Sequence, residues 1–138
     1  MTPPVFLVDA LPVGGETVLD GDEGWHAAGV RRLRAGEALW LADGAGGLAE
    51  CTVLAAERDR LRLAVDRLAR LEPPAPRLVV VQALAKGDRG ELAVEIMTEL
   101  GVDEIVPWAA ARSVVRWQGE RRERSLAKWR STARIAAP

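Results

Sequence analysis

Apolar and polar positions alternate over short distances in the first half of the chain. Five runs of strand length stand between segments rich in glycine, proline and charge: residues 5–8, 16–20, 37–42, 48–56 and 61–68. In the last run, Leu61, Leu63 and Val65 fall on one face of a strand. Residues 24–33 are spaced as a short helix. Short strands with glycine-rich turns and one small helix predict a compact β-barrel.

The pattern changes at a proline-rich segment. Three prolines within residues 73–76 can continue neither a helix nor a strand ladder. This segment is therefore predicted to be a stiff linker between a barrel at residues 1–72 and a second domain at residues 77–138.

The second domain begins with a strand, a helix and a strand. Residues 78–84 and 104–108 are nearly unbroken apolar runs, which predict buried strands, the first covered on both faces. Between them a helix is predicted to begin at Asp88, which forms a capping-box pattern with Glu91. Its apolar stripe is predicted to consist of Leu92, Ala93, Ile96, Met97 and Leu100. A connection of this length favours parallel strands.

The last part of the chain adds an extended piece at residues 113–117 and a helix at residues 120–136. One side of this helix carries Leu126, Trp129, Ala133 and Ala136. Two parallel strands form too small a sheet to cover both its faces. The second domain is therefore expected to be incomplete.

Composition restricts the classes of protein and site. The chain has 138 residues, of which 49% are hydrophobic and 28% charged, as in globular proteins. No apolar run approaches the length of a membrane span. The single cysteine, Cys51, excludes an internal disulfide framework and fits a reducing cytoplasm. One cysteine and one histidine also argue against a zinc site or a Cys-His nucleophilic pair.

Charge is distributed unevenly although the net charge is only −1. Residues 1–24 carry five acidic residues and no Lys or Arg, whereas residues 112–134 carry eight basic and two acidic residues. This asymmetry indicates either a surface that faces a polyanion or a solvated helix face.

Ordered blocks along the whole chain resemble a known enzyme family. They are residues 26–37 (HAAGVRRLRAGE), 41–44 (LADG), 82–89 (QALAKGDR), 98–102 (TELGV), 105–107 (IVP) and 112–115 (RSVV). Together they are similar to the family that methylates uridine N3 in small-subunit ribosomal RNA. The resemblance implies an α/β plus β fold, in which an N-terminal PUA-like β-barrel that binds RNA precedes a SPOUT (α/β knot) methyltransferase domain.

The resemblance also implies partners and a cofactor. The family uses S-adenosylmethionine and no metal, acts on 16S ribosomal RNA in the cytoplasm, and forms homodimers through its knotted region. The glycine-rich loops of the knot have no counterpart in these residues. The chain is therefore expected to hold only the first part of the SPOUT domain, with no cofactor-binding residue, and to be inactive alone.

Candidate RNA-binding residues lie in both domains. Arg31, Arg32 and Arg34 follow the small helix, where they could contact phosphate or line a solvated turn. His26 could contact RNA or hold the start of that helix.

In the second domain, Lys86 and Arg89 follow the carboxyl end of a strand, where open α/β sheets place ligands, although Asp88 between them also suits helix capping. Arg112 follows the next strand and is the candidate catalytic residue, because a guanidinium could stabilise a deprotonated uridine. It could equally bind phosphate or pair with an acid.

Other features have structural interpretations. The glycine-rich residues 43–47 lack phosphate-loop spacing and are predicted to form a hairpin turn, and the five tryptophans are assigned mainly to packing. The main hypothesis is an RNA methyltransferase. The alternative is a non-catalytic RNA-binding module with a vestigial α/β tail, whereas a nucleotide hydrolase is disfavoured by the missing phosphate loop.

Overall fold

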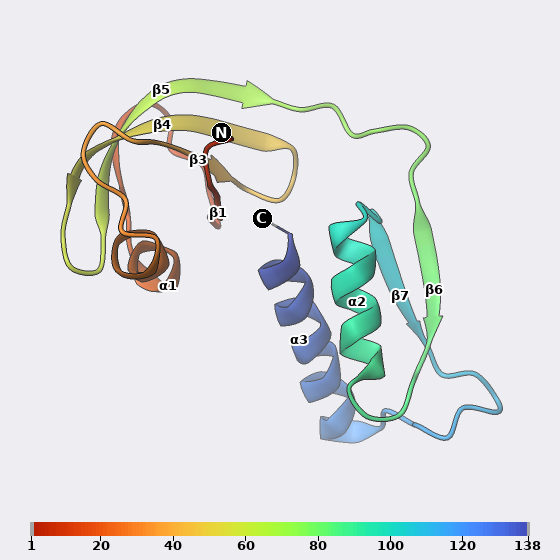
Figure 1. Ribbon diagram of the computed structural model, residues 1–138. Helices are drawn as coiled ribbons and strands as arrows, with labels where there is room; N and C mark the ends of the chain where they lie inside the picture. Colours follow the sequence, from red (N-terminus) through yellow and green to blue (C-terminus); the bar gives the residue numbers. More distant parts are fainter. Residues whose placement is uncertain (1, 138) are drawn as a thin grey trace. The chain divides into compact units, whose positions relative to one another are not determined.

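The computed structural model describes residues 2–137, and the chain divides into two compact units. The first unit extends to Pro73, and the second runs from Pro74 to Ala137 (Figure 1). Each unit has its own hydrophobic core. Among the described residues, no helix combines the length and apolarity needed to cross a membrane.

The first unit is built on one curved five-stranded sheet. Its strands are β1 (Val5–Leu7), β2 (Gly15–Leu19), β3 (Ala38–Ala42), β4 (Gly47–Ala56) and β5 (Leu61–Arg70). They are ordered β1-β3-β4-β5-β2, with β1 parallel to β3 and all other pairs antiparallel. The five strands predicted from the alternating pattern are therefore present, and β5 runs two residues further than expected.

Alternation along the strands places one face of the sheet in the core. Leu39 and Leu41 of β3, Cys51 and Val53 of β4, and Leu61 of β5 are buried, whereas their neighbours along each strand are more exposed. Register shifts occur in β4 between Glu50 and Cys51 and between Val53 and Ala55. Such bulges bend and twist a strand. The long strands β4 and β5 accordingly curve around the core (Figure 1).

The small helix predicted at residues 24–33 consists of two shorter pieces. An α-helical turn, α1, spans Gly21–Trp25, and a π-helical turn, η1, spans His26–Val30. The helix begins earlier than predicted, and Gly24 within it is buried. A Cβ on Gly24 would lie 2.6 Å from the carbonyl oxygen of Leu19 and 2.8 Å from that of Asp59. This close approach fixes α1 against the strand ends.

The second unit contains β6 (Val79–Ala83), α2 (Arg89–Glu99), β7 (Glu104–Trp108) and α3 (Gly119–Ala136). The pair β6 and β7 is parallel, as predicted. The expectation that these strands are buried is wrong, because Val79, Val81 and Trp108 are about half exposed, at 50%, 59% and 53%. The predicted extended piece at residues 113–117 forms no strand and continues a loop.

Helix α2 buries a face that overlaps the predicted stripe only in part. Gly90 and Val94 are buried, whereas the members of the stripe are either half-buried or exposed: Ala93 and Met97 are half-buried, and Leu92, Ile96 and Leu100 are exposed. Gly90 faces Trp129 of α3, and the two helices run side by side (Figure 1). The predicted capping box is also wrong. Asp88 has helical backbone angles and its side chain makes no capping hydrogen bond.

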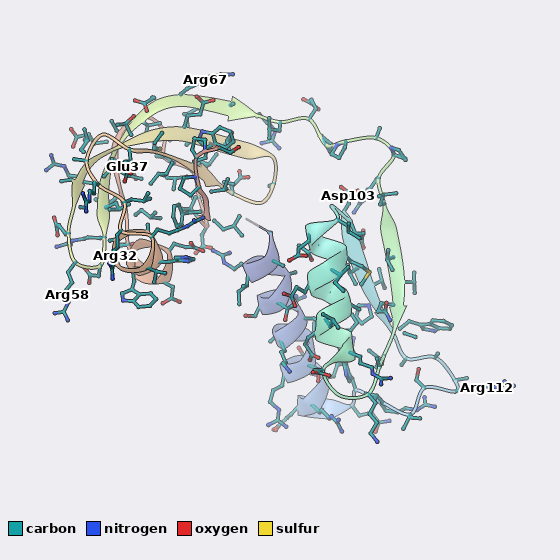
Figure 2. The ribbon with its side chains drawn as sticks, viewed as in Figure 1. Arg32, Glu37, Arg58, Arg67, Asp103 and Arg112 are labelled. Carbon is teal, nitrogen blue, oxygen red and sulfur yellow. The ribbon has the colours of Figure 1, made fainter. Side chains whose placement is uncertain are left out.

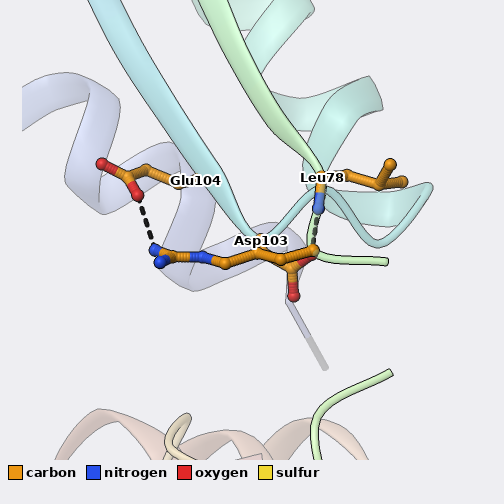
Figure 3. A network of polar contacts seen from close by, with 4 residues as sticks. Leu78, Asp103 and Glu104 are labelled. Atoms are coloured by element: carbon orange, nitrogen blue, oxygen red, sulfur yellow. Dashed lines mark hydrogen bonds and ion pairs between the residues drawn. The ribbon is translucent and has the colours of Figure 1, made fainter. Parts of the chain in front are cut away.

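A polar network connects the starts of β6 and β7. The backbone N–H of Leu78 donates to Oδ2 of Asp103 at 2.7 Å, and the Arg77 guanidinium pairs with Glu104 (Figure 3). The Asp103 N–H donates in turn to the Leu78 carbonyl at 3.0 Å. These contacts fix the parallel register, so both carboxyl ends emerge at the same edge of the sheet.

Candidate nucleic-acid interface

In the first unit, the predicted arginines lie on an exposed segment whose backbone is held by hydrogen bonds. The Arg31 N–H donates to the His26 carbonyl at 2.8 Å, and the Arg34 N–H donates to Oε2 of Glu37 at 2.6 Å. Arg32 has a φ of 55°, in the left-handed region that non-glycine residues rarely adopt. Within residues 2–137, the guanidinium groups of Arg31, Arg32 and Arg34 form no ion pair. Figure 2 shows Arg32 at the surface of this unit. Their side chains are therefore available to an external anion.

His26 has a contact that supports its structural interpretation. Its ring lies edge-on to Phe6, with ring centroids 6.0 Å apart and an interplanar angle of 87°. Phe6 belongs to the core of the unit, whereas His26 itself is exposed. The imidazole thus packs against a core residue while part of His26 remains accessible.

In the second unit, the carboxyl ends of β6 and β7 open onto two cavities. The Leu84 N–H donates to the Trp108 carbonyl at 3.0 Å, which extends the strand pairing to this edge. The first cavity has a volume of about 280 Å³ and is called the cationic cavity. Its charged and polar lining residues are Lys86, Glu91, Arg121, Ser125 and Lys128.

The floor of the cationic cavity is aromatic. Trp117 and Trp129 meet edge to face, with centroids 5.1 Å apart and an interplanar angle of 81°. Trp129 is only 5% exposed and is the main core residue of α3. A Cβ on Gly90 would lie 3.2 Å from Nε1 of Trp129, so glycine leaves room for the indole. The tryptophan packing predicted from the sequence is therefore present here.

Positive charge exceeds negative charge in this cavity. Lys86, Arg121 and Lys128 contribute three cations, and Glu91 contributes one carboxylate. Glu91 Oε1 lies 3.2 Å from Nζ of Lys128. The remaining two cations make the cavity suited to an anion.

A second cavity, called the apolar cavity, adjoins the first. It also has a volume of about 280 Å³ and shares Trp117 with the cationic cavity. Its other lining residues are Leu84, Pro107, Ala109, Arg122 and Leu126. One indole therefore lies between a charged site and a site whose lining residues are apolar except for Arg122.

The structure brings together only some of the predicted site residues. Lys86 lines the cationic cavity, whereas Arg89 and Arg112 line neither cavity. Arg112 is exposed on the loop that follows β7 (Figure 2). Arg121 and Lys128 were recognised only as members of a basic stretch. Their spacing of seven residues, two helical turns, could have placed them on one side of α3.

The described residues offer no metal site. No group of three His, Cys, Asp or Glu side chains within residues 2–137 could hold a metal ion.

Two domain families match the chain in sequence. The RNA methyltransferase PUA domain matches residues 19–66, and the RNA methyltransferase domain matches residues 72–138. The chain is 50% identical over 134 residues to the "Ribosomal RNA small subunit methyltransferase E" of Mycobacterium tuberculosis. The aligned residues make up 96% of this chain and 51% of that protein. The Bacillus subtilis protein of the same name is 27% identical over 120 residues, 86% of this chain and 47% of its own length.

Solved structures agree with these matches. The Neisseria gonorrhoeae ribosomal RNA small subunit methyltransferase E, bound to S-adenosyl methionine, superposes with a TM-score of 0.80 at 27% identity over 98% of this chain and 56% of that one. A predicted RNA methyltransferase from Thermotoga maritima has a TM-score of 0.69 at 27% identity, covering 98% and 58% of the two chains. The predicted fold class is confirmed: a PUA-like domain followed by part of a SPOUT methyltransferase fold. The chain spans about half the length of the curated relatives it matches.

Proposed function

Because the chain belongs to the RNA methyltransferase family, carrying its PUA domain and its methyltransferase domain in that order, we propose that it serves in S-adenosylmethionine-dependent methylation of uridine N3 in 16S ribosomal RNA. The cationic cavity at the carboxyl edge of β6 and β7 is the observation that carries this proposal. An RNA substrate is a polyanion, and basic side chains at such an edge suit its backbone.

Both units are proposed to contact the RNA. In the first, Arg31, Arg32 and Arg34 contact phosphates, and His26 supports their segment while touching the RNA with its exposed edge. In the second, Lys86 and Arg89 extend the contact surface. Residues 1–72 act as the RNA-binding domain, residues 73–76 as a linker, and residues 77–138 as the start of the methyltransferase domain.

Arg112 is proposed to lie next to the reacting uridine. Removal of the N3 proton leaves negative charge on the ring, and a guanidinium close to it would stabilise that charge. The exposed position of Arg112 on the loop after β7 leaves its side chain accessible to a base that is splayed out of the RNA.

The two cavities of the second unit do not fit S-adenosylmethionine. The donor carries a positive sulfonium group, which the excess cations of the cationic cavity would repel. The one carboxylate there, Glu91, is already paired with Lys128, and the only charged residue of the apolar cavity is Arg122. We therefore assign the donor pocket to the part of the relatives' length that this chain does not span.

Two further proposals concern the state of the protein. The resemblance to a family that dimerises through its knotted region supports a homodimer of the complete protein, and the buried free thiol of Cys51 is compatible with the cytoplasm. Light scattering over a concentration series, on a chimaera in which this chain replaces the matched half of a relative, tests the first. A mass that stays monomeric at all concentrations would contradict it.

The activity is tested with a chimaera in which this chain replaces the matched half of the M. tuberculosis relative. The chimaera is incubated with S-adenosylmethionine and small ribosomal subunits from a strain lacking the modification, and the nucleosides are analysed by mass spectrometry. We expect 3-methyluridine to appear, and an Arg112→Met chimaera to form it at least about tenfold more slowly. Arg112→Lys, which keeps the positive charge, is the matched conservative variant.

The rival function is an RNA-binding module without catalysis. It predicts that the chimaera binds ribosomal RNA as tightly as the intact relative but forms no methylated nucleoside. Methylation at a base other than uridine would retain the enzyme class and contradict the substrate. A chimaera that neither binds nor methylates, while remaining folded, would contradict both functions.

A further inference from the structure

We propose that the two adjoining cavities of the second unit form a binding site for one nucleotide of single-stranded RNA, with its phosphate in the cationic cavity and its base or sugar in the apolar cavity. This inference deepens the proposed function and rests on it for the identity of the polymer. The residues that carry it are mostly outside those predicted from the sequence: of the three cations, only Lys86 was singled out.

The charged and polar lining residues of the cationic cavity come from three separate segments. Lys86 follows β6, Glu91 belongs to the first turn of α2, and Arg121 and Lys128 lie on α3. Arg121, Ser125 and Lys128 are four and three residues apart, so they point to one side of the helix. A guanidinium, two ammonium groups and a hydroxyl therefore converge on one space, and all of them can donate hydrogen bonds to phosphate oxygens.

The volume of the cavity suits a phosphodiester. With a volume of about 280 Å³, the cavity is far larger than the space that one water molecule needs. A phosphate group together with a few bridging waters fits within this space.

Glu91 forms an ion pair with one of the three cations, Lys128. Its carboxylate lies 3.2 Å from Nζ of Lys128, with the lysine side chain 65% exposed and the glutamate side chain 21% exposed. Ion pairs this open to water contribute little net stability. A phosphate that also reaches Lys86 and Arg121 can therefore displace Glu91 from Lys128 at small cost.

The apolar cavity supplies the second half of the site. It shares Trp117 with the cationic cavity, and the proposed nucleotide spans this indole with its phosphate on one side and its base or sugar on the other. Leu84 and Leu126 offer apolar surface, and Arg122 offers a planar guanidinium against which a base can stack. Basic residues continue along α3 outside both cavities, at Arg124 and Arg130. Neither arginine lines a cavity, so both serve as controls for the site.

The site is tested in the 138-residue chain by fluorescence anisotropy with a short single-stranded oligoribonucleotide. We expect Lys86→Met and Arg121→Met each to weaken binding about tenfold. Each should also reduce the slope of log affinity against log salt concentration by the amount that corresponds to about one lost phosphate contact. Arg124→Met and Arg130→Met are matched controls on α3, outside the cavities, and should change affinity less than about threefold. Equal losses in cavity and control variants would overturn the site, because they would indicate a diffuse electrostatic field.

Glu91→Gln provides the opposite perturbation. It removes the competing carboxylate and releases Lys128, so RNA binding should become about threefold tighter. Unchanged or weaker binding by this variant, with an unchanged circular dichroism spectrum, would contradict the exchange of Glu91 for phosphate. Lys86→Arg retains the charge and should bind within about threefold of the original protein, which separates loss of charge from misfolding.

Competition identifies the ligand. Inorganic phosphate and uridine monophosphate should displace the RNA only at concentrations at least about a hundredfold higher. Displacement by either at concentrations comparable to the RNA would indicate a site for free anions and overturn the inference. The test is independent of methylation: a chimaera that methylates although the cavity variants bind normally refutes the site alone, whereas specific losses with no methylation refute the catalytic function alone.

Discussion

Replacement of Gly24 by alanine tests how the segment that carries Arg31, Arg32 and Arg34, proposed to contact RNA, is positioned. Gly24 lies in α1, directly before the π-helical turn η1, which leads into Arg31, Arg32 and Arg34. A methyl group on Gly24 would lie 2.6 Å and 2.8 Å from two backbone carbonyl oxygens, well inside the 3.4 Å at which ordinary contact begins. Neither oxygen belongs to a side chain that could rotate away, so α1 itself must shift.

The expected loss of stability follows from two opposing effects. Overpacking typically costs about 1–3 kcal/mol, and a site blocked by backbone on both sides should fall at the upper end. Alanine is favoured over glycine in a helix by at most about 1 kcal/mol, and by less in a single turn. A net loss of about 2 kcal/mol in the free energy of unfolding is therefore expected, which would lower the melting temperature of a unit this size by about 8–16 °C.

Differential scanning calorimetry of the 138-residue chain measures this effect. The control is Gly29→Ala in η1, where the added methyl would make only an ordinary contact of 3.5 Å with Trp25. Gly29→Ala should melt within about 4 °C of the original protein. If the Gly24 variant melts no lower than the Gly29 variant, the close approach of α1 to the strand ends does not position the segment.

Three further predictions concern the cores and one turn. Trp129→Ala should destabilise the second unit by about 3–5 kcal/mol, because it removes the largest residue of a small core. Hydrogen exchange should then show that the amides of α2 and α3 lose their protection while those of the first unit keep it. Burial raises the pKa of the Cys51 thiol to about 11, so the folded protein should resist alkylation at pH 9. Between pH 9 and pH 11 the unfolded state loses the thiol proton and the folded state keeps it, so the free energy of unfolding should fall as the pH rises through this range. A Cys51→Ala variant should lack that part of the pH dependence. Hydrogen bonds from the N–H groups of Ala45 and Gly47 lower the pKa of Asp43 below its ordinary value of 3.8. The stability that these bonds provide is therefore present above pH 3.8 and is lost as the pH falls through the lower pKa of the folded state. In thermal melts, Asp43→Asn should weaken this dependence of stability on acid pH.

The strands of the first unit could be predicted because one side of each faces a single core. Leu61 and Leu63 are both fully buried, whereas Arg62 between them is exposed. A period of two along the chain is therefore visible without knowledge of the partner strands. The turn at Asp43 was equally local, since its side chain bonds to N–H groups two and four residues later. Local chemistry of this kind is recorded directly in the sequence.

The second unit was predicted less well because its helices have more than one apolar side. In α2, Leu92, Ile96 and Leu100 follow helical spacing as regularly as Gly90 and Val94 do. The packing of Trp129 against Gly90 decides which face is buried, and this contact joins residues 39 positions apart. Hydrophobicity alone predicts that the face with the larger side chains is buried. The face with Gly90 is buried instead, because the indole of Trp129 requires the space that a glycine leaves.

The same reasoning explains why the cationic cavity was only partly foreseen. Lys86 could be singled out because it follows a strand end, a position defined by local sequence. Arg121 and Lys128 lie on a helix whose rotation about its own axis is set by Trp129, so their direction depends on the packing of α2. The sequence could thus indicate a basic stretch of eight Lys and Arg residues, to be interpreted as a polyanion-facing surface or as a solvated helix face. Which two of these residues join Lys86 in the cavity depends on the packing of the aromatic core.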